Sequence, residues 1–298
     1  MLEVKNIRKT FGNLVAVDDL SFTVKDGEIF GLLGENGAGK TTTFRMILGL
    51  LEKDKGSILL DNKKIDYNMT DKIGYLTEER SLLTKMTVKE QILYYGALKS
   101  MSSKEILKEL DFWLKHFDIE KYKDKKIKEL SKGNQQKIQF IAAVINRPKL
   151  LILDEPFTGL DPINVKMMKD AIYMLQKCKT SIIFSSHQME YIEEFCEKLI
   201  ILVKGKKVLD GSLRDIKKSY GIEKIVINAD NVDISKLEKI TGVKKVIMKG
   251  EEIEVFIENS SIVSKVFSFI KKYDVKKFEA VEKTLSEIFI EKVGDKNV

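Results

Sequence analysis

Residues 34–41 combine three glycines with a lysine and a threonine at the spacing G-x-x-x-x-G-K-[ST]. The segment lies between a predicted apolar strand, Glu28–Leu33, and a predicted helix over 39–49. Glycines let successive backbone N–H groups turn toward a phosphate, and the helix N-terminus adds positive potential. In this pattern Lys40 reaches the β- and γ-phosphates of a nucleotide, and the Thr41 hydroxyl reaches Mg²⁺. The alternative is a plain glycine-rich turn between a strand and a helix.

This phosphate-binding loop predicts a nucleoside triphosphate site with Mg²⁺ as a cofactor. The residues expected to contact the nucleotide there are Gly34, Glu35, Asn36, Gly37, Ala38, Gly39, Lys40, Thr41 and Thr42.

Two carboxylates follow a second apolar strand, Leu150–Leu153. An ionised Asp154 at the end of a buried strand is costly unless a cation lies close, and nucleotide-bound Mg²⁺ would supply that cation. Glu155 stands one residue further on, where it could orient or deprotonate an attacking water. The alternative is an ordinary Asp-Glu-Pro turn at a strand end.

Residues 130–137, LSKGNQQK, place a candidate N-cap, Ser131, before a helical pattern. The chain here resembles the ATP-binding subunits of ABC transporters, whose motif LSGGQ also lies between the phosphate loop and the acidic pair. Leu130, Ser131 and Gly133 match that motif, whereas Lys132 and Asn134 depart from it. The resemblance implies that Ser131, Gly133 and Asn134 meet the γ-phosphate bound by the opposite subunit of a head-to-tail dimer. A plain N-cap is compatible with that role.

Three further residues match the family pattern. Phe11 corresponds to the aromatic residue that stacks on adenine, although a lone aromatic after a strand is more often part of a core. Asp161 corresponds to the loop that links the two sites of the dimer, and it also suits an N-cap before Pro162. His187, after a predicted strand, corresponds to the histidine that touches the γ-phosphate, although a lone histidine is usually incidental.

One position departs from the family pattern in an informative way. Glu78 stands where the family commonly has a glutamine after a strand. A carboxylate can still ligate Mg²⁺ or position water, so the predicted metal ligands are Thr41, Glu78 and Asp154, and the predicted catalytic residues are Lys40, Glu155 and His187. Together with LSKGNQQK and residues 285–294, Glu78 resembles the branch near sodium-extrusion and drug or peptide exporters.

The elements that must position these residues predict an α/β fold of two domains. Strands alternate with helices from Leu150 onward, which favours a parallel sheet covered on both faces. For residues 1–215 the resemblance implies a mostly parallel sheet with an antiparallel β subdomain and a helical subdomain at about 84–145. Residues 216–298 read as a small C-terminal α+β domain with a βαββαβ, ferredoxin-like order. The length of 298 residues suits two domains.

Charge, cysteine content and apolar runs exclude only a few classes of protein. The net charge of +7 is spread among acidic neighbours, and the two cysteines have no metal-ligand spacing and are expected to be reduced. The apolar runs are too short for a membrane span and we find no signal-peptide pattern, so a separate permease would have to provide the pore.

The resemblance therefore implies an ATP-hydrolysing motor subunit that pairs with a second ATP-binding subunit and a transmembrane permease, at the cytoplasmic face of the membrane. Export is the expected direction. The alternative is an ATPase that acts on nucleic acid or ribosomes. Such relatives usually carry a long coiled-coil insertion or two cassettes in one chain, and we expect no nucleic-acid partner here.

Overall fold

The computed structural model describes residues 1–65, 67–79 and 81–294, and it divides into two compact units, Met1–Asp210 and Gly211–Val298. The division comes slightly before the expected one at 215/216. That expected boundary would have cut through helix α7 (Leu213–Tyr220), which belongs entirely to the second unit. Each unit is described by itself.

The first unit is built on one sheet, with the strand order β5-β4-β1-β2-β10-β9-β3-β8-β7-β6. Strands β3, β6, β7, β8 and β9 pair in parallel, whereas β1, β2, β4 and β5 pair antiparallel. The strand bounds are β1 Leu2–Phe11, β2 Leu14–Val24, β3 Ile29–Gly34, β4 Lys55–Leu60, β5 Lys63–Lys64, β6 Ile73–Leu76, β7 Leu150–Asp154, β8 Ser181–Ser185, β9 Lys198–Val203 and β10 Lys206–Ser212. A mostly parallel sheet with an antiparallel β subdomain confirms the predicted fold class.

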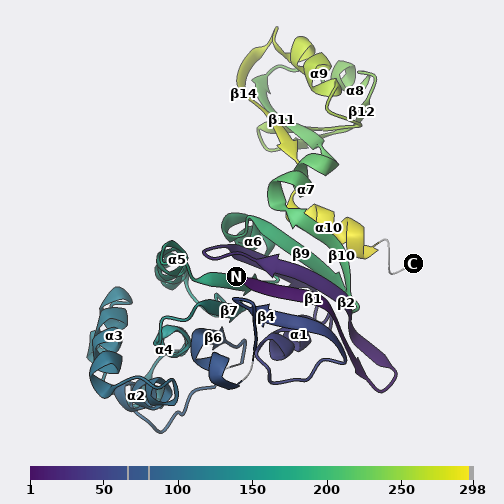
Figure 1. Ribbon diagram of the computed structural model, residues 1–298. Helices are drawn as coiled ribbons and strands as arrows, with labels where there is room; N and C mark the ends of the chain where they lie inside the picture. The colour runs from purple at the N-terminus through teal and green to yellow at the C-terminus, as the bar shows by residue number, and fades with distance from the viewer. Residues whose placement is uncertain (66, 80, 295–298) are drawn as a thin grey trace. The chain divides into compact units, whose positions relative to one another are not determined.

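Two helices, α2 and α3, lie side by side next to α4 in Figure 1. Each of α2 and α3 begins with a capping box, Thr87 with Glu90 and Ser102 with Glu105, which satisfies the first backbone N–H groups of the helix. The helix bounds of this unit are α1 Lys40–Ile47, η1 Tyr67–Lys72, α2 Val88–Leu98, α3 Ser103–His116, η2 Glu120–Tyr122, η3 Ile127–Glu129, α4 Lys132–Val144, α5 Pro162–Lys177 and α6 Met189–Phe195. Every element between Val88 and Val144 is helical, as the pattern predicted.

The central strands β3, β7 and β8 are buried along their whole length. Their near-continuous apolar runs are typical of parallel strands covered on both faces. Because the strands run in one direction, their carboxyl ends meet at one edge, and Asp154 at the end of β7 pairs in register with Ser185 of β8. This edge brings together the phosphate loop after β3 and the acidic pair after β7.

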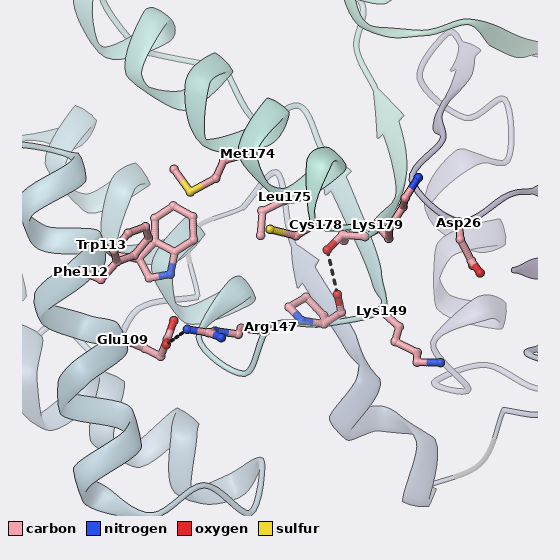
Figure 2. A pocket seen from close by; sticks show the side chains of 12 residues that line it. Asp26, Glu109, Phe112, Trp113, Arg147, Lys149, Met174, Leu175, Cys178 and Lys179 are labelled. Carbon is pink, nitrogen blue, oxygen red and sulfur yellow. Dashed lines mark hydrogen bonds and ion pairs between the residues drawn. The ribbon is translucent and has the colours of Figure 1, made fainter.

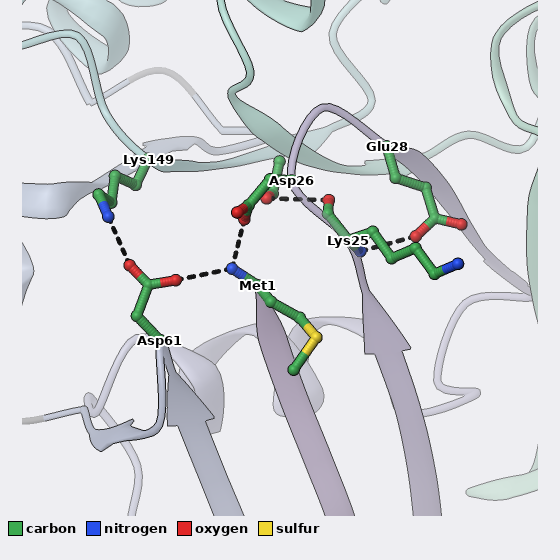
Figure 3. Close-up of polar contacts among 7 residues, drawn as sticks. Met1, Lys25, Asp26, Glu28, Asp61 and Lys149 are labelled. Atoms are coloured by element: carbon green, nitrogen blue, oxygen red, sulfur yellow. Dashed lines mark hydrogen bonds and ion pairs between the residues drawn. The ribbon is translucent and has the colours of Figure 1, made fainter.

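The opposite ends of these strands carry an ion-pair cluster, drawn in Figure 3. The Asp61 carboxylate accepts from the Met1 ammonium at 2.7 Å and from Lys149 Nζ at 2.5 Å, and Asp26 also accepts from Met1. The hydrogen bond from Lys149 and that from the Met1 ammonium lower the pKa of Asp61 to about 2. The cluster thus links the start of β1, the turn after β4 and the start of β7.

The second unit is a four-stranded antiparallel sheet of order β12-β13-β11-β14. Its elements are α7 Leu213–Tyr220, β11 Ile222–Asp230, α8 Ile234–Glu238, β12 Val243–Lys249, β13 Glu252–Ile257, α9 Ile262–Ile270, β14 Asp274–Glu282 and α10 Leu285–Gly294. Apolar side chains of α8 and α9 pack with those of the sheet in a separate core. Between β11 and β14 the order is βαββαβ with the first and third strands central, which confirms the predicted ferredoxin-like arrangement.

Candidate functional site: a phosphate loop facing an acidic pair

The phosphate loop joins the end of β3 to the start of α1. Gly39 adopts φ 106° immediately before the helix, and a Cβ there would lie 2.5 Å from the Ala16 carbonyl oxygen. Only glycine fits this position, because both the backbone conformation and the close approach exclude a side chain. The N–H groups of the first turn of α1 have no partner within the helix, so they and the helix dipole face the loop.

Lys40 turns its side chain back over this loop. Its ammonium Nζ donates to the carbonyl oxygen of Gly34 at 2.6 Å and to that of Glu35 at 3.2 Å. These bonds hold the positive charge above the N-terminus of α1, where an anionic ligand would meet both. Ala38 and Gly34 are buried, so they shape the loop and do not line the cavity beside it.

Asp154 is buried at the end of β7, with 4% of its surface exposed. Its Oδ1 accepts a hydrogen bond from Ser185 Oγ at 2.5 Å. Burial raises the pKa of the Asp154 carboxyl, while the Ser185 hydrogen bond and the charge of Lys40 act in the opposite direction. A buried carboxylate of this kind favours a bound cation.

Glu155 follows with a positive φ of 52°, which turns its side chain into the same space. This conformation is uncommon for a residue with a long side chain and is typical of functional sites. Glu155 Oε2 lies 2.9 Å from His187 Nδ1 and accepts from Ser186 Oγ at 3.3 Å. The carboxylate is thus held by two residues that follow β8, and the sequence-predicted pair Glu155 and His187 is in direct contact.

A cavity of about 380 Å³ lies between the loop and the acidic pair. Lys40, Thr41, Glu78, Asp154 and Glu155 all line it. The other sequence-predicted residues that line it are Phe11, Glu35, Asn36, Gly37, Gly39 and Thr42. Phe11 is half exposed at the mouth, so it is available to stack on a ring.

Four residues of this cavity were missed by sequence reasoning: Leu14, Val15, Ala16 and Lys204. The first three open β2, which begins three residues after Phe11, and no motif in the sequence marks them as nucleotide contacts. Lys204 lies in the turn between β9 and β10 and had no signal of its own.

The loop that carries Glu78 is fastened to helix α4. Gln139 Nε2 donates to the carbonyl oxygen of Thr77 at 2.9 Å and to that of Glu79 at 3.1 Å. One turn earlier, Gln136 Nε2 donates to the carbonyl oxygen of Pro156 at 3.2 Å, next to the acidic pair. The same helix therefore supports both the Glu78 loop and the segment after the acidic pair.

The predicted dimer contacts lie outside this cavity. Ser131 caps α4, because its Oγ accepts from the Asn134 N–H at 3.3 Å. Asp161 caps α5 in the same way, by accepting from the Asn164 N–H at 3.0 Å. A Cβ on Gly133 would lie 3.4 Å from the Asn164 side chain, so the N-termini of α4 and α5 are neighbours. They form one surface, separate from the phosphate loop of their own chain.

Among the described residues, no group of three or more His, Cys, Asp or Glu side chains is arranged to hold a metal on its own. Within the same described ranges, no helix is long and apolar enough to cross a membrane.

A phosphate loop that faces a buried Asp-Glu pair at the carboxyl edge of a parallel sheet is typical of a P-loop nucleoside triphosphatase. Comparison with known proteins narrows the class. The ABC transporter family profile matches residues 17–158, and that of the ATP-binding protein DrrA1-3-like C-terminal domain matches residues 211–293. The chain belongs to the ABC transporter ATP-binding proteins: it is an ATP-hydrolysing motor subunit.

Two relatives and one solved structure illustrate the match. The uncharacterized ABC transporter ATP-binding protein YhaQ of Bacillus subtilis is 48% identical over 99% of both chains. The Nod factor export ATP-binding protein I of Burkholderia lata is 32% identical, covering 81% of this chain and 83% of that one. The ATP-binding cassette MJ0796, solved as a dimer in a post-hydrolysis state with ADP and phosphate, superposes with a TM-score of 0.66 and 25% identity over 72% of this chain and 99% of that one.

Proposed function

We propose that the cavity binds ATP with Mg²⁺ and hydrolyses it with the residues predicted from the sequence. The observation that carries this proposal is the meeting of Lys40, Thr41, Glu78, Asp154 and Glu155 in one cavity. Lys40 and the first turn of α1 bind the phosphates, and Phe11 stacks on adenine. Thr41, Glu78 and Asp154 would hold Mg²⁺, which supplies charge neutralisation at the β- and γ-phosphate oxygens.

Glu155 then orients and deprotonates the attacking water. Its carboxylate is fixed by Ser186 and His187, so it is placed before the nucleotide arrives. His187 has an exposed side chain and also reaches toward the γ-phosphate. Hydrolysis leaves two anionic products beside Glu78 and Glu155, whose negative charges favour product release.

A second subunit completes each site in this proposal. ABC ATP-binding proteins form dimers and work with transmembrane permeases. Ser131, Gly133 and Asn134 begin a helix whose N-terminus does not face its own phosphate loop, so its positive end is available to the γ-phosphate held by the partner. Asp161, at the start of the neighbouring helix, would contact the same interface.

The permease would dock in a groove of about 270 Å³ beside the Glu78 loop. The groove is lined by Leu50, Leu82, Tyr95 and Gln139 among others, and Leu50 is 71% exposed. Because Gln139 also holds the carbonyls of Thr77 and Glu79, a partner segment in this groove would act directly on the metal-facing loop. We propose export as the direction, since relatives include a Nod factor export protein, and the cytoplasmic membrane face as the location.

Mixing two inactive variants, Lys40→Ala and Ser131→Arg, tests the shared site. In a mixed head-to-tail dimer, one site combines both defects and the other is whole. With random pairing about half of the dimers are mixed, so about a quarter of wild-type ATPase activity is the expected upper value. The measurement is phosphate release after subunit exchange.

The matched control mixes Lys40→Ala with the double variant Lys40→Ala, Ser131→Arg, which leaves no whole site in any dimer. If exchange is demonstrated and the first mixture is as inactive as the control, Ser131 serves only as an N-cap.

A further inference from the structure

A second cavity, of about 570 Å³, lies at the other end of the parallel strands. Its wall comes from α3, from the end of α5 and from the residues just before β7 and β8 (Figure 2). β7 separates it from the nucleotide site, since the cavity adjoins Lys149 and the acidic pair follows Leu153. At about 3.3 Å per residue, the strand places the two sites about 15 Å apart.

The cavity wall is largely apolar and aromatic. Phe112 and Trp113 come from α3, and Met174 and Leu175 from α5. Trp113 is 3% exposed, yet its indole nitrogen Nε1 has no hydrogen-bond partner among the described residues. A buried N–H donor without an acceptor is costly, so an acceptor bound next to it would be stabilised. Figure 2 shows the indole nitrogen on the side that faces Glu109 and Arg147.

Positive groups border this wall. Arg147 donates to Glu109 through one guanidinium nitrogen, while most of its side chain is exposed, so it keeps free donors. Lys149 is paired with Asp61, and Lys179 makes no ion pair among the residues that the structure describes. The cavity wall therefore contains three cationic side chains and only two carboxylates. Asp26 is already paired with the Met1 ammonium, and Glu109 with Arg147.

We propose that this cavity binds a small carboxylic acid with an apolar body. The carboxylate accepts from the Trp113 indole N–H and from the free donors of the Arg147 guanidinium, and the apolar body packs on Phe112, Met174 and Leu175. The volume and the balance of a mostly apolar wall with few polar groups are those of small-molecule sites. Because α3 and α5 both line it, a bound acid would fix the helical subdomain against the sheet.

The chain carries its own reporters for this test. Trp113 is the single tryptophan, and Cys178 in the cavity wall is the exposed one of two cysteines. Burial raises the pKa of the Cys196 thiol, so that residue stays unreactive. Tryptophan emission and the rate of maleimide labelling of Cys178 therefore both report occupancy, without nucleotide and independently of the proposed ATPase chemistry.

The experiment titrates the full chain with octanoate and with 4-phenylbutanoate. The corresponding alcohols, octan-1-ol and 4-phenylbutan-1-ol, are titrated separately as controls that lack the carboxylate. We expect a saturable change in tryptophan emission and slower Cys178 labelling, with a Kd below about 1 mM for at least one acid and at least tenfold weaker binding of its alcohol. Binding of octanoate alone would assign an aliphatic, lipid-derived ligand, and binding of 4-phenylbutanoate alone an aromatic one.

Two variants test the carboxylate contacts. Arg147→Lys keeps the ion pair with Glu109 but loses the planar fork, and Trp113→Phe keeps the ring but loses the donor; each should weaken acid binding about tenfold. Arg8→Lys, at the ion pair with Asp18 outside the cavity, is the matched control and should bind as the wild type does. Cys178 labelling is the readout for Trp113→Phe.

Three results would overturn the proposal. They are no saturable response to either acid up to 3 mM, equal binding of acid and alcohol, or unaltered affinity in both variants. Labelling that slows only as the protein concentration rises, with no effect of the acids, would assign the cavity to a second copy of the chain instead.

Discussion

The two ends of strand β7 carry charge in different ways. At its carboxyl end, the buried carboxylates of Asp154 and Glu155 have hydroxyl groups and an imidazole as partners. Just before its amino end, Arg147 and Lys149 form ion pairs with Glu109 and Asp61. Charges with protein counter-ions are already compensated, whereas the carboxylates of Asp154 and Glu155 remain available to a cation. The difference separates a reactive edge of the sheet from a supporting one.

The strongest way to break this comparison is to neutralise Glu155 at the reactive edge. Glu155→Gln should keep ATP binding and lower ATP turnover by about 10²–10⁴-fold, or about 3–5 kcal/mol of barrier, because a positioned general base is lost. Turnover and nucleotide affinity are measured together. Glu190→Gln on α6 is the control, and near-normal hydrolysis by Glu155→Gln would remove Glu155 from its role.

Glu78→Gln tests whether the charge of Glu78, or only its oxygen atom, matters in the same cavity. Glutamine keeps one oxygen at the same reach, so ATPase activity should persist within about tenfold, with a shifted Mg²⁺ requirement. A full Mg²⁺ titration of the rate is the measurement, with the neighbouring Glu79→Gln as control. Identical curves for wild type and Glu78→Gln would show that the charge is unused.

Asp154→Asn tests, through thermal stability, whether the buried charge at the carboxyl end of β7 is uncompensated. The amide still accepts from Ser185 but carries no buried charge, so the nucleotide-free protein should gain about 1 kcal/mol, or about 2–4 °C in Tm. Thermal unfolding measures this gain, and Asp170→Asn, on the exposed side of α5, should change nothing. A lower Tm for Asp154→Asn would mean that its carboxylate is already compensated.

The supporting edge predicts the smallest effect. The pKa of Asp61 is lowered to about 2, below the ordinary value of 3.8, so its ion pairs stabilise the fold above about pH 4 and lose that contribution as the pH falls toward 2. Asp61→Asn should therefore lower Tm by about 1 °C at pH 7, since exposed pairs contribute little. The difference from wild type should vanish near pH 2; a constant difference would contradict the pairing.

Much of this architecture was predictable because local patterns coincide with the fold. The phosphate loop, the strand before Asp154 and the order of the small second unit all follow from short apolar runs bounded by turn residues. The cavity wall from Leu14 to Ala16 was not predictable, because the strand continues through the polar pair Asp18-Asp19, which is ordered by pairing with β1 and β10.

The glutamine contacts of α4 show a second limit. Gln136 and Gln139 lie on a helix whose pattern predicts burial, but their partners are carbonyl groups far away in the sequence. No local pattern records which carbonyl a buried amide will meet. Likewise, the contact between Glu155 and His187 depends on a turn with positive φ, which sequence alone does not assign to a glutamate.

The glutamine side chains of helix α4 also connect two segments that line or flank the cavity. The side-chain amides of Gln136 and Gln139, one turn apart, donate hydrogen bonds to Pro156 and to the segment from Thr77 to Glu79, respectively. Breaking the hydrogen bonds of either glutamine leaves a buried amide N–H group unsatisfied, and a tilt of the rigid helix would disturb the hydrogen bonds of both glutamines. Helix α4 therefore couples the Glu78 loop to the segment after the acidic pair, so we expect a displacement of α4 to be felt by both.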